Sequence, residues 1–119
     1  MRVAILGASN KAERYSYKAL QSLRKHSHEV IPIHPMLEQI EGIPVIKDLD
    51  LIQGPIDTLT LYVGAEISSK QAEKIVRLKP RRVIFNPGAE NSVLEQQLAN
   101  QGVITLQACT LVLLGTNQF

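Results

Sequence analysis

The sequence has one cysteine, no tryptophan, few other aromatic residues and a small net charge. The single cysteine, Cys109, excludes an internal disulfide and favours a reducing compartment, so we expect a cytoplasmic protein. An aromatic fraction of 4% and a formal charge of +2 argue against base-stacking platforms and basic nucleic-acid-binding surfaces. The N-terminal apolar run is too short for a signal peptide or a membrane span. We therefore expect neither a nucleic-acid nor a membrane partner.

What the sequence contains is typical of an ordinary globular domain. Apolar residues make up 45% of the 119 positions and charged residues 20%. This length is near the commonest domain size and is sufficient for a real core. No repeat, linker or low-complexity segment divides the chain, so we expect residues 1–119 to form a single domain.

Short apolar runs alternate with amphipathic segments along the chain. The runs predict strands at 3–6, 29–33, 58–63, 82–85 and 103–106, with a shorter strand or extended arm at 41–46. Helices are predicted from Ser16 to about His26, from Ser68 to about Leu78 and from Ser92 to about Asn100, with one helical turn at 48–52. The alternation predicts an α/β fold with a mainly parallel sheet and helices on both faces. Pro32 within the second strand indicates an edge position or a strand end near a ligand.

The turn after the first strand has the features of an anion site. Gly7, Ala8 and Ser9 carry little side-chain bulk, so a phosphate could approach the backbone before the next helix begins. The alternative is a tight turn without a ligand, since the three-glycine fingerprint of dinucleotide sites is absent. Three more turns with small or restricted residues, His34-Pro35, Gly64 and Pro87-Gly88, follow strands that would end at the same sheet edge. Four such turns predict a nucleotide crevice there.

The charges near this edge favour coenzyme A over NAD. An NAD site requires an acid at the end of the second strand, where the nearest acid is Glu38. Coenzyme A carries a 3′-phosphate besides its pyrophosphate and needs more positive charge. We expect at least one of Lys11, Arg14 and Lys18 to contact a phosphate, Arg14 being favoured because its planar fork can hold two oxygens. The alternative is that these cations form an ordinary solvated surface.

These residues, in this order, resemble the small stand-alone CoA-binding domain proteins. The resemblance rests on Gly7-Ala8-Ser9, Arg14, Ser16-Tyr17, the run from Val30 to Pro35, Gly42, the run from Asn86 to Asn91, and Cys109. Such proteins are similar to the N-terminal CoA-binding domain of the succinyl-CoA synthetase alpha subunit. The resemblance implies a Rossmann-like, doubly wound fold that binds coenzyme A or an acyl-CoA. The family usually has asparagine where this chain has His34, and glycine where it has Ser27-His28.

The resemblance also implies a role for each turn. The turn at residues 7–9 would receive the pyrophosphate with help from Arg14, the turns at 33–35 and 62–64 would flank the adenosine, and residues 87–91 would face the pantetheine arm. The implied cofactor-binding residues are Gly7, Ala8, Ser9, Asn10, Arg14, Ser16, Ile33, His34, Pro35, Tyr62, Val63, Gly64, Pro87, Gly88, Ala89 and Asn91.

No residue is predicted to be catalytic or to bind a metal. The three histidines lack metal-ligand spacing, Cys109 reads as a small buried hydrophobe rather than a reactive thiol, and Glu90 as a helix N-terminal charge. We therefore expect a binding module without catalysis of its own. The alternatives are an NAD(P)- or other nucleotide-dependent oxidoreductase-type domain and a structural subunit of a larger complex. The apolar tail from Cys109 to Leu114 should pack on the domain or meet a partner, either a second copy or another protein.

Overall fold

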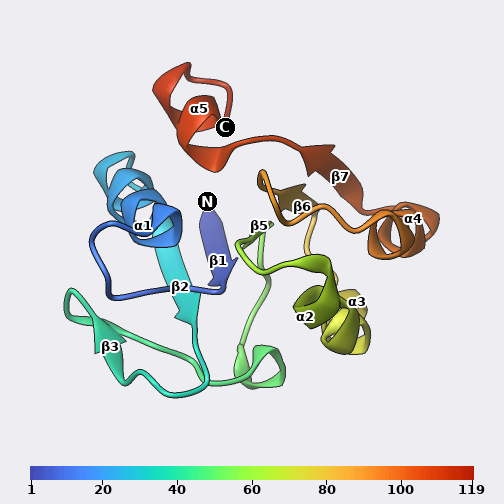
Figure 1. Cartoon of the computed structure of the whole chain (residues 1–119), viewed down its shortest axis with the longest axis horizontal. Helices are drawn as coiled ribbons and strands as arrows, with labels where there is room; N and C mark the ends of the chain where they lie inside the picture. The colour runs from blue at the N-terminus through green and yellow to red at the C-terminus, as the bar shows by residue number, and fades with distance from the viewer.

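The computed structural model describes residues 1–119 and shows an α/β fold around a five-stranded parallel sheet (Figure 1). The strands are β1 (Arg2–Leu6), β2 (Glu29–Ile33), β5 (Thr58–Leu61), β6 (Arg82–Phe85) and β7 (Ile104–Gln107). Their order is β2-β1-β5-β6-β7, and every neighbouring pair is parallel. The chain extends the sheet from β1 toward β2 and later from β5 toward β7, so the strand order reverses between β1 and β5. The predicted Rossmann-like, doubly wound fold is confirmed.

Helices cover both faces of this sheet. They are α1 (Tyr15–Lys25), α2 (Ala65–Lys70), α3 (Ala72–Leu78), α4 (Ser92–Asn100) and α5 (Thr110–Gly115), with a 3₁₀ turn, η1, at Leu49–Leu51. Figure 1 shows α1 and α5 on one side of the sheet and α2, α3 and α4 on the other. A small antiparallel hairpin, β3 (Gln39–Ile40) with β4 (Ile43–Pro44), lies outside the main sheet.

Alternation along β1 divides the core into two layers. Val3 and Ile5 pack with residues of α1 and α5, among them Leu20, Leu23 and Leu114. Ala4 and Leu6 point to the opposite face and belong to the larger cluster with Ile75 of α3 and Leu94 and Leu98 of α4. Both faces of the central strands are therefore buried, which explains why the strands appear in the sequence as unbroken apolar runs.

The structure confirms the predicted bounds of α4, Ser92–Asn100, but corrects the predicted capping residue of all three helices. Arg14, not Ser16, precedes α1, and Ser16 is buried in the first turn. Ser68 lies inside α2, where its hydroxyl donates to the Ala65 carbonyl, and the predicted single helix is two helices that meet at Gln71. Asn91 caps α4, because its Oδ1 accepts from the Leu94 N–H at 3.1 Å. Glycine and asparagine suit N-cap positions as well as serine, so serine spacing alone misplaced the caps of α2 and α4. Arg14 makes no side-chain capping hydrogen bond, so no capping signal marks the start of α1.

The segment after β2 also differs from the prediction. The expected arm at 41–46 contains β4, and its partner β3 begins earlier, at Gln39. The last strand lies one residue later than predicted. The helical turn at 48–52 is confirmed as η1, where Asp48 accepts from the Asp50 N–H. Pro32 lies in β2, an edge strand of the main sheet, as its position predicted.

The apolar tail forms α5 and packs on the sheet through Leu114. A buried polar network fixes the start of this helix. Asn86 Oδ1 accepts from the Thr110 N–H at 2.9 Å, and Asn86 Nδ2 donates to Thr60 Oγ1 at 2.6 Å. The hydroxyls of Thr60 and Thr110 are hydrogen-bonded at 2.8 Å. No helix in the structure has both the length and the apolar character needed to cross a membrane.

Candidate nucleotide site

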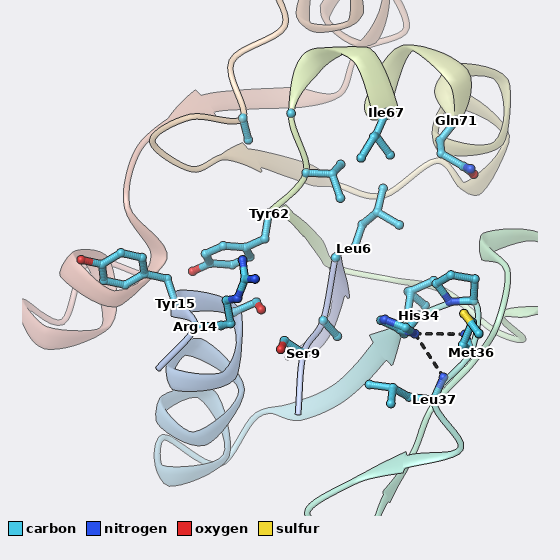
Figure 2. A pocket seen from close by; sticks show the side chains of 18 of the residues that line it. Leu6, Ser9, Arg14, Tyr15, His34, Met36, Leu37, Tyr62, Ile67 and Gln71 are labelled. Atoms are coloured by element: carbon cyan, nitrogen blue, oxygen red, sulfur yellow. Dashed lines mark hydrogen bonds between the residues drawn. The ribbon is translucent and has the colours of Figure 1, made fainter. Parts of the chain in front are cut away.

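A cleft of about 920 Å³ lies at the carboxyl ends of the parallel strands, beside the point where the strand order reverses. This volume is within the range of roughly 300–1,000 Å³ for small-molecule and cofactor sites. All four predicted turns line it, and Figure 2 shows Ser9, His34 and Tyr62 among the lining side chains. Every residue of the predicted site contributes to the lining except Asn91.

The β1–α1 turn forms the floor of the cleft at Gly7. This residue has φ of +90°, and a Cβ atom there would lie 2.8 Å from Val63 Cγ1 and 3.0 Å from the Tyr62 carbonyl oxygen. Only glycine fits both the backbone angle and the space. The N–H groups of Gly7, Ser9 and Asn10 donate no hydrogen bond within the chain. The turn therefore presents free backbone donors, as an anion-binding turn requires.

The three cations that line this cleft are Lys11, Arg14 and Lys47. Lys11 and Arg14 line it from the α1 side, and neither forms a salt bridge. Lys18 is not part of the lining, and its ammonium lies 5.3 Å from the centre of the Tyr15 ring. Lys47, which sequence reasoning missed, also lines the cleft, next to the end of β2. No local motif marks Lys47, because its position depends on how its segment pairs with β2.

One carboxylate, Asp48, lines the cleft, and its oxygens are already engaged. Oδ2 accepts from the Lys74 ammonium, and Oδ1 accepts from the Asp50 N–H at 2.9 Å. The hydrogen bond from Lys74, with that backbone donor second, lowers the pKa of Asp48. Glu38, the acid nearest the end of β2 in sequence, is not part of the lining. The end of β2 thus lacks a free carboxylate that could bind a ribose diol.

His34 is half-buried at the end of β2 and holds the following turn. Its Nδ1 accepts from the N–H groups of Met36 at 3.0 Å and Leu37 at 3.1 Å (Figure 2). An asparagine side chain makes the same kind of contact with the backbone two residues ahead. Histidine at this position therefore holds the same kind of turn that an asparagine would form. Because Nδ1 accepts, Nε2 carries the proton of the neutral ring.

The other residues singled out in the sequence have structural contacts. Asn91 caps α4, and its Nδ2 donates to Ser68 Oγ at 2.8 Å, which joins α4 to α2. Glu90 accepts from the Gly88 N–H at 3.0 Å. Cys109 is a free, partly buried thiol beside α5. The Tyr62 hydroxyl is buried without a hydrogen-bond partner, and burial raises the pKa of this tyrosine to about 12. No cluster of His, Cys, Asp and Glu side chains is placed to hold a metal ion.

Comparison with known protein families shows which family this chain belongs to. The model of a family described as the CoA binding domain matches residues 1–115. The chain belongs to the CoA-binding domain family. An uncharacterized protein, YneT from Bacillus subtilis (strain 168), is 24% identical to this chain over 112 residues, which cover 93% of this chain and 83% of YneT.

Several solved structures share the fold of this chain. A crystal structure of an uncharacterized protein matches with a TM-score of 0.93 and 39% identity, over 99% of this chain and 97% of the other. Acetyl-coenzyme A synthetase 1 of Ca. Korarchaeum cryptofilum, solved with phosphate and ADP, matches with a TM-score of 0.74 and 17% identity. The match covers 90% of this chain and 25% of the enzyme's chain, and at this identity the likeness shows the fold alone.

Proposed function

We propose that this chain binds coenzyme A or an acyl-CoA in the cleft, with the pyrophosphate at the β1–α1 turn. The observation that carries the proposal is the set of three unpaired backbone N–H groups, at Gly7, Ser9 and Asn10, beside the unpaired cations Lys11 and Arg14. Free backbone donors bind phosphate oxygens by direct hydrogen bonds, and the nearby cations favour the negative charge. Membership of the CoA-binding domain family supports the same ligand.

The remaining turns suit the rest of the molecule. The turns at 33–35 and 62–64 lie on the two strands that flank β1, so both would border an adenosine placed above it. The turn at Pro87-Gly88-Ala89 belongs to the next strand, β6, and would face the pantetheine arm. Ile67 and Val63 add apolar surface to the lining of the cleft, which suits the uncharged arm.

The charges support coenzyme A over the alternative, NAD. An NAD site uses a carboxylate at the end of the second strand to bind the ribose hydroxyls. In this cleft Asp48 is paired with Lys74, and the lining also contains the cations Lys11, Arg14 and Lys47. We also propose a binding role without catalysis, because His34 uses Nδ1 to hold its own turn and Asp48 is occupied, so neither is free to act as a base.

Ligand-induced thermal stabilisation tests the proposal. A ligand at ~100 times its dissociation constant adds about 2.7 kcal/mol to the free energy of unfolding. CoA should therefore raise the melting temperature by several degrees, and NAD at equal concentration should raise it much less. Arg14→Ala should reduce the CoA effect, whereas Lys25→Ala, at the far end of α1, should leave it unchanged. An equal or larger shift with NAD would contradict the assignment.

A further inference from the structure

We propose that His34 and Lys47 together form the seat for the 3′-phosphate of coenzyme A. This seat is separate from the β1–α1 turn that takes the pyrophosphate. The inference rests on the proposed function, since it identifies how the same cleft distinguishes one phosphorylated adenosine from another.

Backbone pairing brings the two residues together. Ile33, the last residue of β2, forms a parallel bridge with Ile46. The Ile46 N–H donates to the Pro32 carbonyl at 2.9 Å, and the His34 N–H donates to the Ile46 carbonyl at 3.1 Å. The next positions in this register are His34 and Lys47, and both line the cleft. Two residues separated by a hairpin in the sequence are therefore neighbours at the end of β2.

His34 contributes a fixed hydrogen-bond donor. Its Nδ1 accepts from two backbone N–H groups, those of Met36 and Leu37, so Nε2 bears the proton. In Figure 2 the second ring nitrogen points away from these two partners. A donor with a set direction suits an acceptor such as a phosphate oxygen.

Lys47 contributes charge that is available to a ligand. Its only ion pair is with Glu38 at 3.5 Å, and the side chains are 53% and 87% exposed, respectively. Exposed pairs of this kind contribute little, so a phosphate can displace the carboxylate. Asp48, the other acid next to Lys47, accepts from Lys74 and the Asp50 N–H. The ammonium of Lys47 therefore meets no tightly bound counter-charge.

The position in the fold identifies which phosphate is bound. In doubly wound dinucleotide sites an acid after the second strand binds the 2′-hydroxyl of the adenosine ribose, or an arginine nearby accommodates a 2′-phosphate. The 3′-phosphate of CoA is attached to the adjacent carbon of the same ribose. This chain has a donor and a cation at that place. Lys11 and Arg14 stand on the α1 side of the cleft, next to the β1–α1 turn, and so remain with the pyrophosphate.

Titration calorimetry with CoA and dephospho-CoA tests the assignment, because the two differ only in the 3′-phosphate. The parent should prefer CoA by about ten- to a hundredfold, as expected for a charge-assisted contact. Lys47→Met should remove most of this preference and leave the affinity for dephospho-CoA unchanged. His34→Asn keeps an acceptor for the turn and removes Nε2–H, so it should lower the preference by about two- to tenfold. Lys25→Met is the matched control and should keep the parent preference.

The other outcomes separate two kinds of failure. If the parent binds both ligands equally, or Lys47→Met keeps the preference, the seat is wrong while the proposed function stands. If Arg14→Ala alone removes the preference, the 3′-phosphate lies on the α1 side. If neither ligand binds the parent, the proposed function itself fails. Imidazole ¹⁵N chemical shifts of the free protein should show an unprotonated Nδ1 at His34; a protonated Nδ1 would refute the donor assignment without any ligand.

Discussion

The fit of Gly7 against the end of β5 makes the β1–α1 turn sensitive to one added methyl group. In Gly7→Ala the new Cβ would lie 2.8 Å from Val63 Cγ1 and 3.0 Å from the Tyr62 carbonyl oxygen. Both distances are shorter than ordinary contacts, and the carbonyl belongs to the backbone, so it cannot rotate away. The substitution also places an L side chain at φ of +90°.

The two effects have separable magnitudes. An unfavourable backbone angle costs about 1–3 kcal/mol, and crowding in a packed region costs about another 1–3 kcal/mol. Gly7→Ala should therefore lower the free energy of unfolding by about 2–6 kcal/mol, a large part of the ~5–15 kcal/mol typical of a domain. Gly102 is a matched control, because its φ is +83° and a Cβ there would meet nothing within 4 Å. Gly102→Ala should show the backbone cost alone.

Urea denaturation of both variants, followed by far-UV circular dichroism, measures the difference. We expect Gly7→Ala to be less stable than Gly102→Ala by about 1–3 kcal/mol with an unchanged m-value. Equal losses would show that the end of β5 yields to the methyl group, and would refute the argument from crowding. Gly7→Val adds branches at the same point and, under conditions in which it stays folded, should abolish CoA binding. Binding as tight as the parent's would move the phosphate seat away from this turn.

Two further predictions concern titratable side chains. Hydrogen bonds from Arg81 hold the pKa of Asp57 at about 2, against an ordinary 3.8, so this carboxylate stabilises the fold above about pH 4 and the contribution is lost as the pH falls toward 2. Urea denaturation at about pH 5 and pH 3 should show a smaller acid-induced loss for Asp57→Asn than for the parent, and identical losses would contradict this. The Tyr62 hydroxyl is buried without a partner, so Tyr62→Phe should raise the free energy of unfolding by up to about 1 kcal/mol. It should also remove a titration near pH 12 from the absorbance spectrum, and a less stable variant would mean that the hydroxyl is paired.

The sheet and the cleft could be predicted because their signals are local. Strands such as β1 are buried on both faces and therefore appear as apolar runs, and each turn of the cleft directly follows its strand. Parallel topology then places these turns at one edge without further information. Helix caps were harder to predict from the sequence. Asn91 and Ser92 are both suitable N-cap residues for α4, and only the backbone conformation shows that Asn91 is the cap.

The details of the site that were missed depend on pairing between distant segments. Lys47 reaches the cleft because Ile46 pairs with Ile33, and neither sequence run signals this bridge. Asp48 is neutralised by Lys74, which lies 26 positions away on α3. Asn91 has the residue type expected of a ligand contact, and its amide joins two helices instead. Residue type and strand order were enough to predict where the cleft lies. Which charged side chains line it, and which of them are paired, could be read only from the tertiary contacts.

The buried polar network at the start of α5 should slow the exchange of backbone amide protons near the end of the chain. A helix of six residues is too short to persist by itself, and the last segment of a chain normally frays first. Here the first amide of the helix, at Thr110, donates to Asn86, whose own amide holds Thr60 in the central strand β5. All three side chains are buried, so releasing that proton requires opening the sheet as well as the helix. The Thr110 amide should therefore exchange with deuterium at the rate of the central strands rather than of a chain end.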